Sequence, residues 1–175
     1  CDNDSTSTRN YYLVLHRGSV DINKSIYFSL SAYDRIKTSS VSVSISGTAS
    51  NKGNSSISMS GVDSSVISVN LTNDTKIPNK AIVTSISSSG TQSPSQGNVH
   101  HMIMPASNSI WYTSTVSSAS SGHYNIDVDD GIPVKQKWSF KYNALATAKS
   151  TMRNVKLTIG FQYDLHDTDY KTYIR

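Results

Sequence analysis

Hydrophobic and polar residues alternate most regularly near the end of the sequence, over residues 153–165. The odd-numbered positions from residue 155 onward are apolar: Val155, Leu157, Ile159, Phe161, Tyr163 and Leu165. Successive side chains of a β-strand point to opposite faces of a sheet, so this alternation predicts a half-buried strand. The strand would be about twice the ordinary length of five or six residues. Such a strand spans a large sheet, bends near Gly160, or pairs beyond its own domain.

The same two-residue period recurs along much of the chain, at 26–33, 41–46, 67–72, 123–128 and 134–142. Residues 11–16 differ, because apolar side chains occupy both parities there, which predicts a strand buried on both faces or lying against a partner. Turn residues separate the segments at intervals of roughly 8 to 15 residues, the spacing of a sandwich or barrel. The pattern predicts an all-β fold, an antiparallel β-sandwich of immunoglobulin-like or jelly-roll-like type with about ten strands.

Two segments depart from this pattern. Residues 143–150 read N-A-L-A-T-A-K-S, which predicts one short helix that crosses between two strands. Residues 87–98 are rich in Ser, Gly, Pro and Gln, which predicts a mobile loop. We expect residues 1–10 to form a flexible polar tether and residues 11–175 to form a single sandwich domain.

Composition strengthens the all-β prediction. The chain has 34 Ser and 15 Thr, and all 12 of its acidic residues are Asp. Since Glu is absent and other strong helix formers are scarce, Thr, Val, Ile and Tyr dominate, and these residues favour strands. The net charge of +4 is spread over single Lys and Arg residues, so no nucleic-acid footprint is present. No apolar run reaches the roughly 20 residues of a membrane helix.

The single cysteine is Cys1, and the polar segment D-N-D-S-T-S-T-R follows it. This arrangement resembles the start of a mature bacterial lipoprotein, in which a lipid is attached to the first Cys. The resemblance covers about nine residues, and a chance start or an artefact would look the same. It implies lipid attachment at Cys1, a membrane anchor and a fold outside the cytoplasm, at the cell surface or anchored at the outer membrane or in the periplasm.

Residues 154–165 are loosely similar to the closing strand of chaperone–usher pilins. Two features depart from that family: the chain continues for ten residues after Leu165, and one Cys cannot form an internal disulfide. The resemblance implies a structural subunit of an extracellular assembly, of pilus or secretion-machine type. Its partners would be other protein subunits, through self-association or an envelope complex, with Tyr11, Leu13 and Leu15 as the strand-exchange contacts.

Two alternative functions stay open at this point. The chain could be a lipid-anchored binding module that captures a glycan or a protein partner, with Trp111, Tyr112 and Tyr124 as ligand-facing aromatics. It could also be a viral or phage structural protein, whose composition would look similar.

Candidate chemistry is sparse, and we expect a non-enzymatic protein without a cofactor. Serine is so abundant that a Ser–His–Asp triad could be drawn anywhere, and neither a G-x-S-x-G elbow nor a phosphate-binding glycine loop occurs. Asp127, Asp129 and Asp130 form a weak calcium candidate, although turn-forming Asp explains them equally. His100 and His101 are adjacent on a predicted strand and would point to opposite faces, so they do not form a zinc pair.

Overall fold

The computed structural model describes residues 34–54, 60–115 and 122–165, together with positions 12, 14, 16, 18–19, 21, 23–25, 27 and 29. The chain divides into two units, residues 1–33 and residues 34–175. The described residues contain ten strands and no helix. All ten strands belong to the second unit, and every strand pairing within it is antiparallel.

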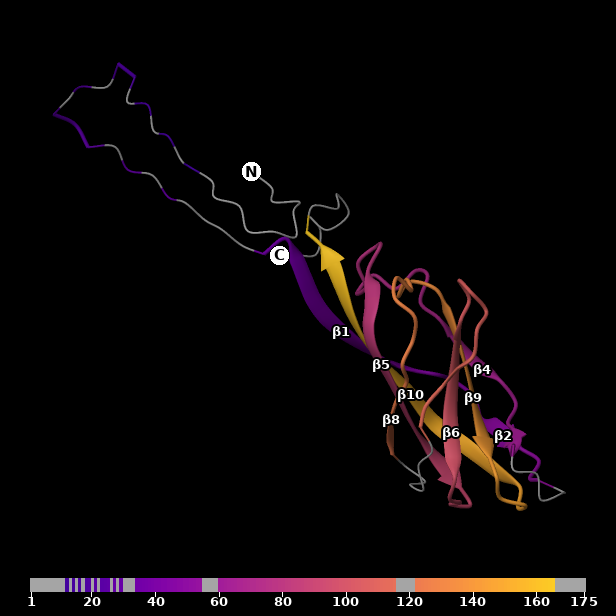
Figure 1. The fold of residues 1–175 in the computed structure, drawn as a ribbon. Helices are drawn as coiled ribbons and strands as arrows, with labels where there is room; N and C mark the ends of the chain where they lie inside the picture. Colours follow the sequence, from indigo (N-terminus) through magenta and orange to yellow (C-terminus); the bar gives the residue numbers. More distant parts are fainter. Residues whose placement is uncertain are drawn as a thin grey trace. The chain divides into compact units, whose positions relative to one another are not determined.

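The first sheet has five strands and is built around β10 (Figure 1). Strand β10 (Ser150–Asp164) pairs on one side with β1 (Ile36–Ser44) and β2 (Ala49–Asn51). On its other side it pairs with β5 (Ile82–Ser93), which in turn pairs with β8 (His123–Asn125). The predicted long strand is therefore central to this sheet.

The second sheet also has five strands and is built around β9 (Lys137–Ala144). Strands β3 (Val62–Asp63) and β4 (Ile67–Asn70) pair with one edge of β9. Strand β6 (Val99–Pro105) pairs with its other edge, and β7 (Tyr112–Thr113) follows β6.

The hydrophobic core combines the inner faces of the two sheets. The alternating residues of β9 and β10 supply its fully buried centre: Trp138, Phe140, Tyr142, Val155, Leu157 and Ile159. The indole nitrogen of Trp138 donates a hydrogen bond of 3.0 Å to the carbonyl of Val134, so its one polar group is satisfied in the core. The all-β prediction is confirmed, and the two antiparallel sheets with a shared core are consistent with a β-sandwich.

The predicted helix at 143–150 is wrong. Asn143 and Ala144 end β9 and Ser150 begins β10, so only residues 145–149 connect the two strands. The backbone N–H of Asn54 donates to the carbonyl of Ala146 at 3.0 Å, which holds this connection against a neighbouring loop. Pairing of Ala144 with Val62 and Val99 satisfies the backbone there, and this tertiary pairing overrides the helix propensity of alanine.

The predicted mobile loop at 87–98 is wrong over residues 87–93, which belong to β5. This part of β5 is rich in Ser and Gly because it is crowded. Ser87 and Ser88 are buried, and a Cβ built on Gly90 would lie 2.9 Å from the sulfur of Met152. Small side chains are required here by packing, so a composition typical of loops occurs in a central strand.

The first unit shows one local feature. The backbone N–H of Lys24 donates to the carbonyl of Asp21 at 3.0 Å, and that of Asn23 donates to the Asp21 carboxylate at 3.0 Å. These hydrogen bonds form a turn at residues 21–24. The sandwich was expected to begin at residue 11, whereas the strands of the described residues begin at Ile36. No strand includes the described positions between 12 and 29.

We expect Ile159→Asp to abolish folding, because it places an unpaired carboxylate in the fully buried centre of the core. The milder Ile159→Val should lower the free energy of unfolding by about 1 kcal/mol. Gln162→Asp on the exposed face of β10 is the matched control, and we expect both it and the natural chain to unfold cooperatively. Chemical denaturation followed by circular dichroism measures all three, and a cooperatively folded Ile159→Asp would contradict the assignment of faces.

Candidate functional site

The sandwich has a long free strand edge at β1. Among the described strands, β1 pairs with β10 alone, and its other edge carries no strand (Figure 1). The other edge strands of the described sheets, β2, β3, β4, β7 and β8, are two to four residues long, whereas β1 has nine. Sheet edges are usually protected by short strands, charges or covering segments. The edge of β1 is therefore unusually long.

Two hydrogen bonds define which backbone groups of β1 face outward. The N–H of Leu165 donates to the carbonyl of Arg35 at 2.9 Å, and the N–H of Ile45 donates to the carbonyl of Val155 at 2.8 Å. The register between these two contacts is unbroken. Hydrogen-bonded pairs alternate in an antiparallel ladder, so the odd-numbered residues of β1 bond to β10. The even-numbered residues direct N–H and C=O to the open edge: Ile36, Thr38, Ser40, Ser42 and Ser44.

The side chains of the same five residues are all exposed, and none is charged. Lys37 is the single charged residue of β1. Opposite these residues, Val41 and Val43 pack against the core, which fixes the face that β1 presents to the sandwich. The edge thus offers five backbone donor and acceptor pairs with small, mostly hydroxyl-bearing side chains and little electrostatic protection.

The end of the β1–β10 pair is held by a charged contact. Arg35 donates from Nε to Asp164 Oδ1 at 2.8 Å and from its terminal nitrogen to Asp164 Oδ2 at 2.6 Å. This two-point geometry orients the planar guanidinium on the carboxylate. Further along, the hydroxyls of Ser42 and Thr158 lie 2.8 Å apart across the pair. These contacts hold β1 against β10 while its outer edge carries no described strand.

The aromatic residues that the sequence suggested for ligand binding do not form one surface. Trp111 and Tyr112 are half-buried near β7. Tyr124 is only 3% exposed and stacks on His101 with ring centroids 3.7 Å apart. The prediction that Tyr124 faces a ligand is wrong, because its parity on β8 directs it into the core.

Contacts within the protein already engage the two half-buried aromatics. The ammonium of Lys141 lies 4.4 Å from the ring centroid of Trp111, a cation–π contact that covers one face of the indole. The Tyr112 hydroxyl donates to Asp129 Oδ2 at 2.5 Å, and this hydrogen bond raises the pKa of Tyr112. The polar group of Tyr112 and one face of Trp111 are thus already engaged within the protein.

The calcium candidate Asp127, Asp129 and Asp130 gains no support as a metal site. Among the described residues, no group of three or more His, Cys, Asp or Glu side chains could hold a metal ion. Asp129 instead accepts the hydrogen bond from Tyr112 described above, and residues 130–131 form a turn, which agrees with the turn interpretation of these Asp residues. Cys1, Tyr11, Leu13 and Leu15 lie outside the described residues.

His101, which the sequence singles out only as half of an adjacent His pair, lies between the two sheets. It is fully buried on β6, and its Nδ1 lies 2.8 Å from the hydroxyl of Ser88 on β5. Its Nε2 has no hydrogen-bond partner among the described residues. Burial lowers the pKa of His101 from 6.5 to about 3, so the ring is neutral at ordinary pH. This pair joins the sheets by a polar contact within an apolar core.

Comparison with known proteins gives one informative relative. No protein-family model matches the chain. It is 50% identical over 159 residues to the uncharacterized protein YbdN of Bacillus subtilis (strain 168). The alignment covers 91% of this chain and 55% of the relative, so the chain spans about half the length of the protein it matches. The described residues include no helix with the length and hydropathy of a membrane span.

The buried imidazole makes stability depend on pH. The folded-state pKa of His101 lies below its unfolded value, so the unfolded chain binds more protons under pH 6.5. The contribution of the neutral ring is complete above pH 6.5 and is lost as the pH falls toward about 3. We expect the free energy of unfolding to drop by about 2 kcal/mol between pH 7 and pH 5 from this group alone.

Urea denaturation of the natural chain and of the double variant Ser88→Ala/His101→Phe at several pH values checks this dependence. The double variant removes the titrating ring and the hydroxyl that it would leave unpaired. Equal losses of stability in the two proteins between pH 7 and pH 5 would show that His101 is not the responsible group.

Proposed function

We propose that this chain is a non-enzymatic structural subunit of an assembly outside the cytoplasm. Copies would associate by adding a β-strand to the open edge of β1. The observation that carries this proposal is the run of five outward-directed backbone positions from Ile36 to Ser44. In strand addition, main-chain hydrogen bonds provide affinity and side-chain contacts provide specificity. An immunoglobulin-like or jelly-roll-like topology for the sandwich stays part of the proposal.

The proposed donor is the segment 11–16 of a second copy. Its sequence Y-Y-L-V-L-H is apolar on both parities and carries no Asp, Lys or Arg. At the described positions of this segment, Tyr12 and Val14 expose 86% and 74% of their surface. A strand of six residues is long enough to satisfy most of the outward groups of β1. Burying its apolar side chains on a neighbour would remove their surface from water.

We expect Ser40→Pro to prevent association and leave the sandwich folded. Proline lacks an N–H, and at an even-numbered residue of β1 the missing donor is one that faces outward. Sedimentation velocity of the full chain over a range of concentrations measures association, and thermal unfolding monitors the fold. Ser40→Thr keeps the N–H and is the matched control, which should associate as the natural chain does.

The donor is tested by Leu13→Asp, which should weaken association without changing the melting temperature of the sandwich. Filaments or regular particles of the natural chain in electron micrographs would support a structural subunit. A natural chain that stays monomeric at all concentrations would overturn the proposal and favour the lipid-anchored binding module. Assembly of Ser40→Pro at the natural concentration would exclude the β1 edge as the contact.

Lipid attachment at Cys1 and a location outside the cytoplasm stay predictions of the sequence. A bacterial relative is compatible with the lipoprotein resemblance. Intact-mass measurement of the protein from its natural source should give a mass above that of the bare chain by the mass of the lipid. Cys1→Ser should abolish this increment, and an unmodified Cys1 in the natural protein would contradict the prediction.

A further inference from the structure

We propose that the outer face of the first sheet binds an acidic polysaccharide along the first half of β10. Two grooves follow one another along this strand. The first has a volume of 720 Å³ and includes Arg153 and Lys156, and the second has a volume of 430 Å³ and includes Lys52 and Lys149. Both belong to the sandwich unit, and their proposed ligand is independent of the proposed association through β1.

The first groove exists because the sheet is locally interrupted there. On β10, Asn154 and Val155 together oppose the single residue Gly90 of β5, since the register shifts between Arg153 and Lys156. Asn154 adopts a φ of 54°, in the left-handed region that non-glycine residues rarely occupy. Such an extra residue is a β-bulge, and bulges are enriched next to binding and active sites.

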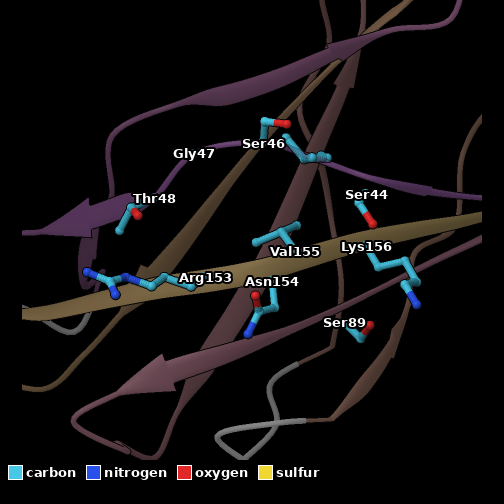
Figure 2. A pocket seen from close by; sticks show the side chains of 10 residues that line it. Ser44, Ser46, Gly47, Thr48, Ser89, Arg153, Asn154, Val155 and Lys156 are labelled. Atoms are coloured by element: carbon cyan, nitrogen blue, oxygen red, sulfur yellow. The ribbon is translucent and has the colours of Figure 1, made fainter.

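The bulge also determines which side chains line the groove. Before it, Met152 points into the core, and after it, Val155 does so. Core-facing residues of β10 are therefore even-numbered before the bulge and odd-numbered after it. As a result, Arg153 and Lys156 are both exposed on the outer face. Figure 2 shows that these two side chains leave β10 in different directions, with Asn154 between them. One small anion would not contact both cations, so the arrangement suits an extended ligand with repeated charges.

The grooves have cationic side chains and no carboxylates. No Asp among the described residues lines either groove. On the five strands of this sheet the one carboxylate is Asp164, which is paired with Arg35. Arg153, Lys156, Lys52 and Lys149 form no ion pair or side-chain hydrogen bond with any described residue. These four cations are therefore free to bind an anionic ligand, and Arg can do so through two parallel N–H donors.

Unpaired backbone groups add to the first groove. The chain leaves β10 after Ile45 and returns at Ala49, so residues 46–48 lie opposite the bulge without pairing to it. Within the described part of the chain, the N–H groups of these three residues donate no hydrogen bond. The hydroxyls of Ser44, Thr48 and Ser89 also line this groove (Figure 2). These groups match the hydroxyl and ring oxygens of a sugar.

The lining argues against a nucleic acid as the ligand. Proteins that bind single strands stack the bases on aromatic side chains. No aromatic residue of the described chain lines either groove. A hydroxyl-rich, cationic surface without stacking platforms instead suits carboxylate or sulfate groups carried on a polyhydroxyl chain.

The test measures binding of the full chain to four immobilised polymers at about physiological salt, where exposed charges are already screened. Polygalacturonate presents carboxylates, heparin presents sulfates, dextran is neutral, and oligothymidylate represents single-stranded DNA. We expect binding to at least one of the two acidic polysaccharides and none to dextran. Arg153→Gln/Lys156→Gln should weaken that binding about tenfold or more, since charge-assisted hydrogen bonds are lost.

Lys76→Gln is the control, because it removes one positive charge, half the change of the double variant, from an exposed loop that lines neither groove. It should change the dissociation constant by less than about twofold. Ser89→Asp provides a second variant, in which a carboxylate faces Lys156 across the pair of strands. Ser89→Asp should also weaken binding, and it tests the proposal if the double variant does not fold. The proposal is overturned if no acidic polysaccharide binds, if Lys76→Gln weakens binding equally, or if oligothymidylate binds most tightly.

Discussion

The structure depends on the pairing of β10 with strands on both of its sides. Three of the other four strands in the first sheet are hydrogen-bonded directly to it, and its inner face supplies the centre of the core. Because β10 follows every other strand in sequence, β1 and β5 have no common partner until residues 150–164 are present. Such long-range pairing carries an entropy cost of loop closure, which is typical of slowly folding all-β topologies.

The contacts between the sheets are polar at a few defined positions. Ser88 and His101 meet at 2.8 Å, and the hydroxyls of Tyr142 and Ser150 lie 2.9 Å apart. Burial of a polar group without a partner is costly, so these pairs favour one alignment of the sheets over others. The serine-rich composition thus has two physical roles. Small side chains let strands pack closely, as beside Gly90, and hydroxyls pair with His101 Nδ1 and with the Tyr142 hydroxyl in the core.

The sequence predicted several of the strands whose alternation is regular, although the described positions 27 and 29 of the equally regular segment 26–33 belong to no strand. The faces of Trp138, Phe140 and Tyr142 and of Val155 to Phe161 are as expected, because side-chain period follows directly from strand geometry. Pairing partners could not be predicted, since alternation says nothing about which strands are neighbours. The sequence predicts a loop over the part of β5 from residue 87 to residue 93, because packing against Met152 demands the small residues that loops also use. The helix predicted at 143–150 does not form, because the strand pairing of its ends outweighs the local helix propensity.

The candidate sites were the least predictable part of the molecule. The open edge of β1 follows from the absence of a described neighbour, and the cationic grooves follow from a register shift at Asn154. Both features depend on which strands pair and in which register, and a short sequence motif does not show either. The sequence does contain a signal that Tyr124 belongs to the core, because Tyr124 shares a parity with the apolar residues Ile126 and Val128. The structure buries both Tyr124 and Ile126.

The bulge at Asn154 also constrains how the length of this chain can vary. Residues before it place even positions in the core, and residues after it place odd positions there. Deletion of a single residue in this segment would make the alternation of side chains continuous along β10. Either Met152 or the apolar residues that begin with Val155 would then point away from the core. The number of residues between Met152 and Val155 is therefore fixed by the core.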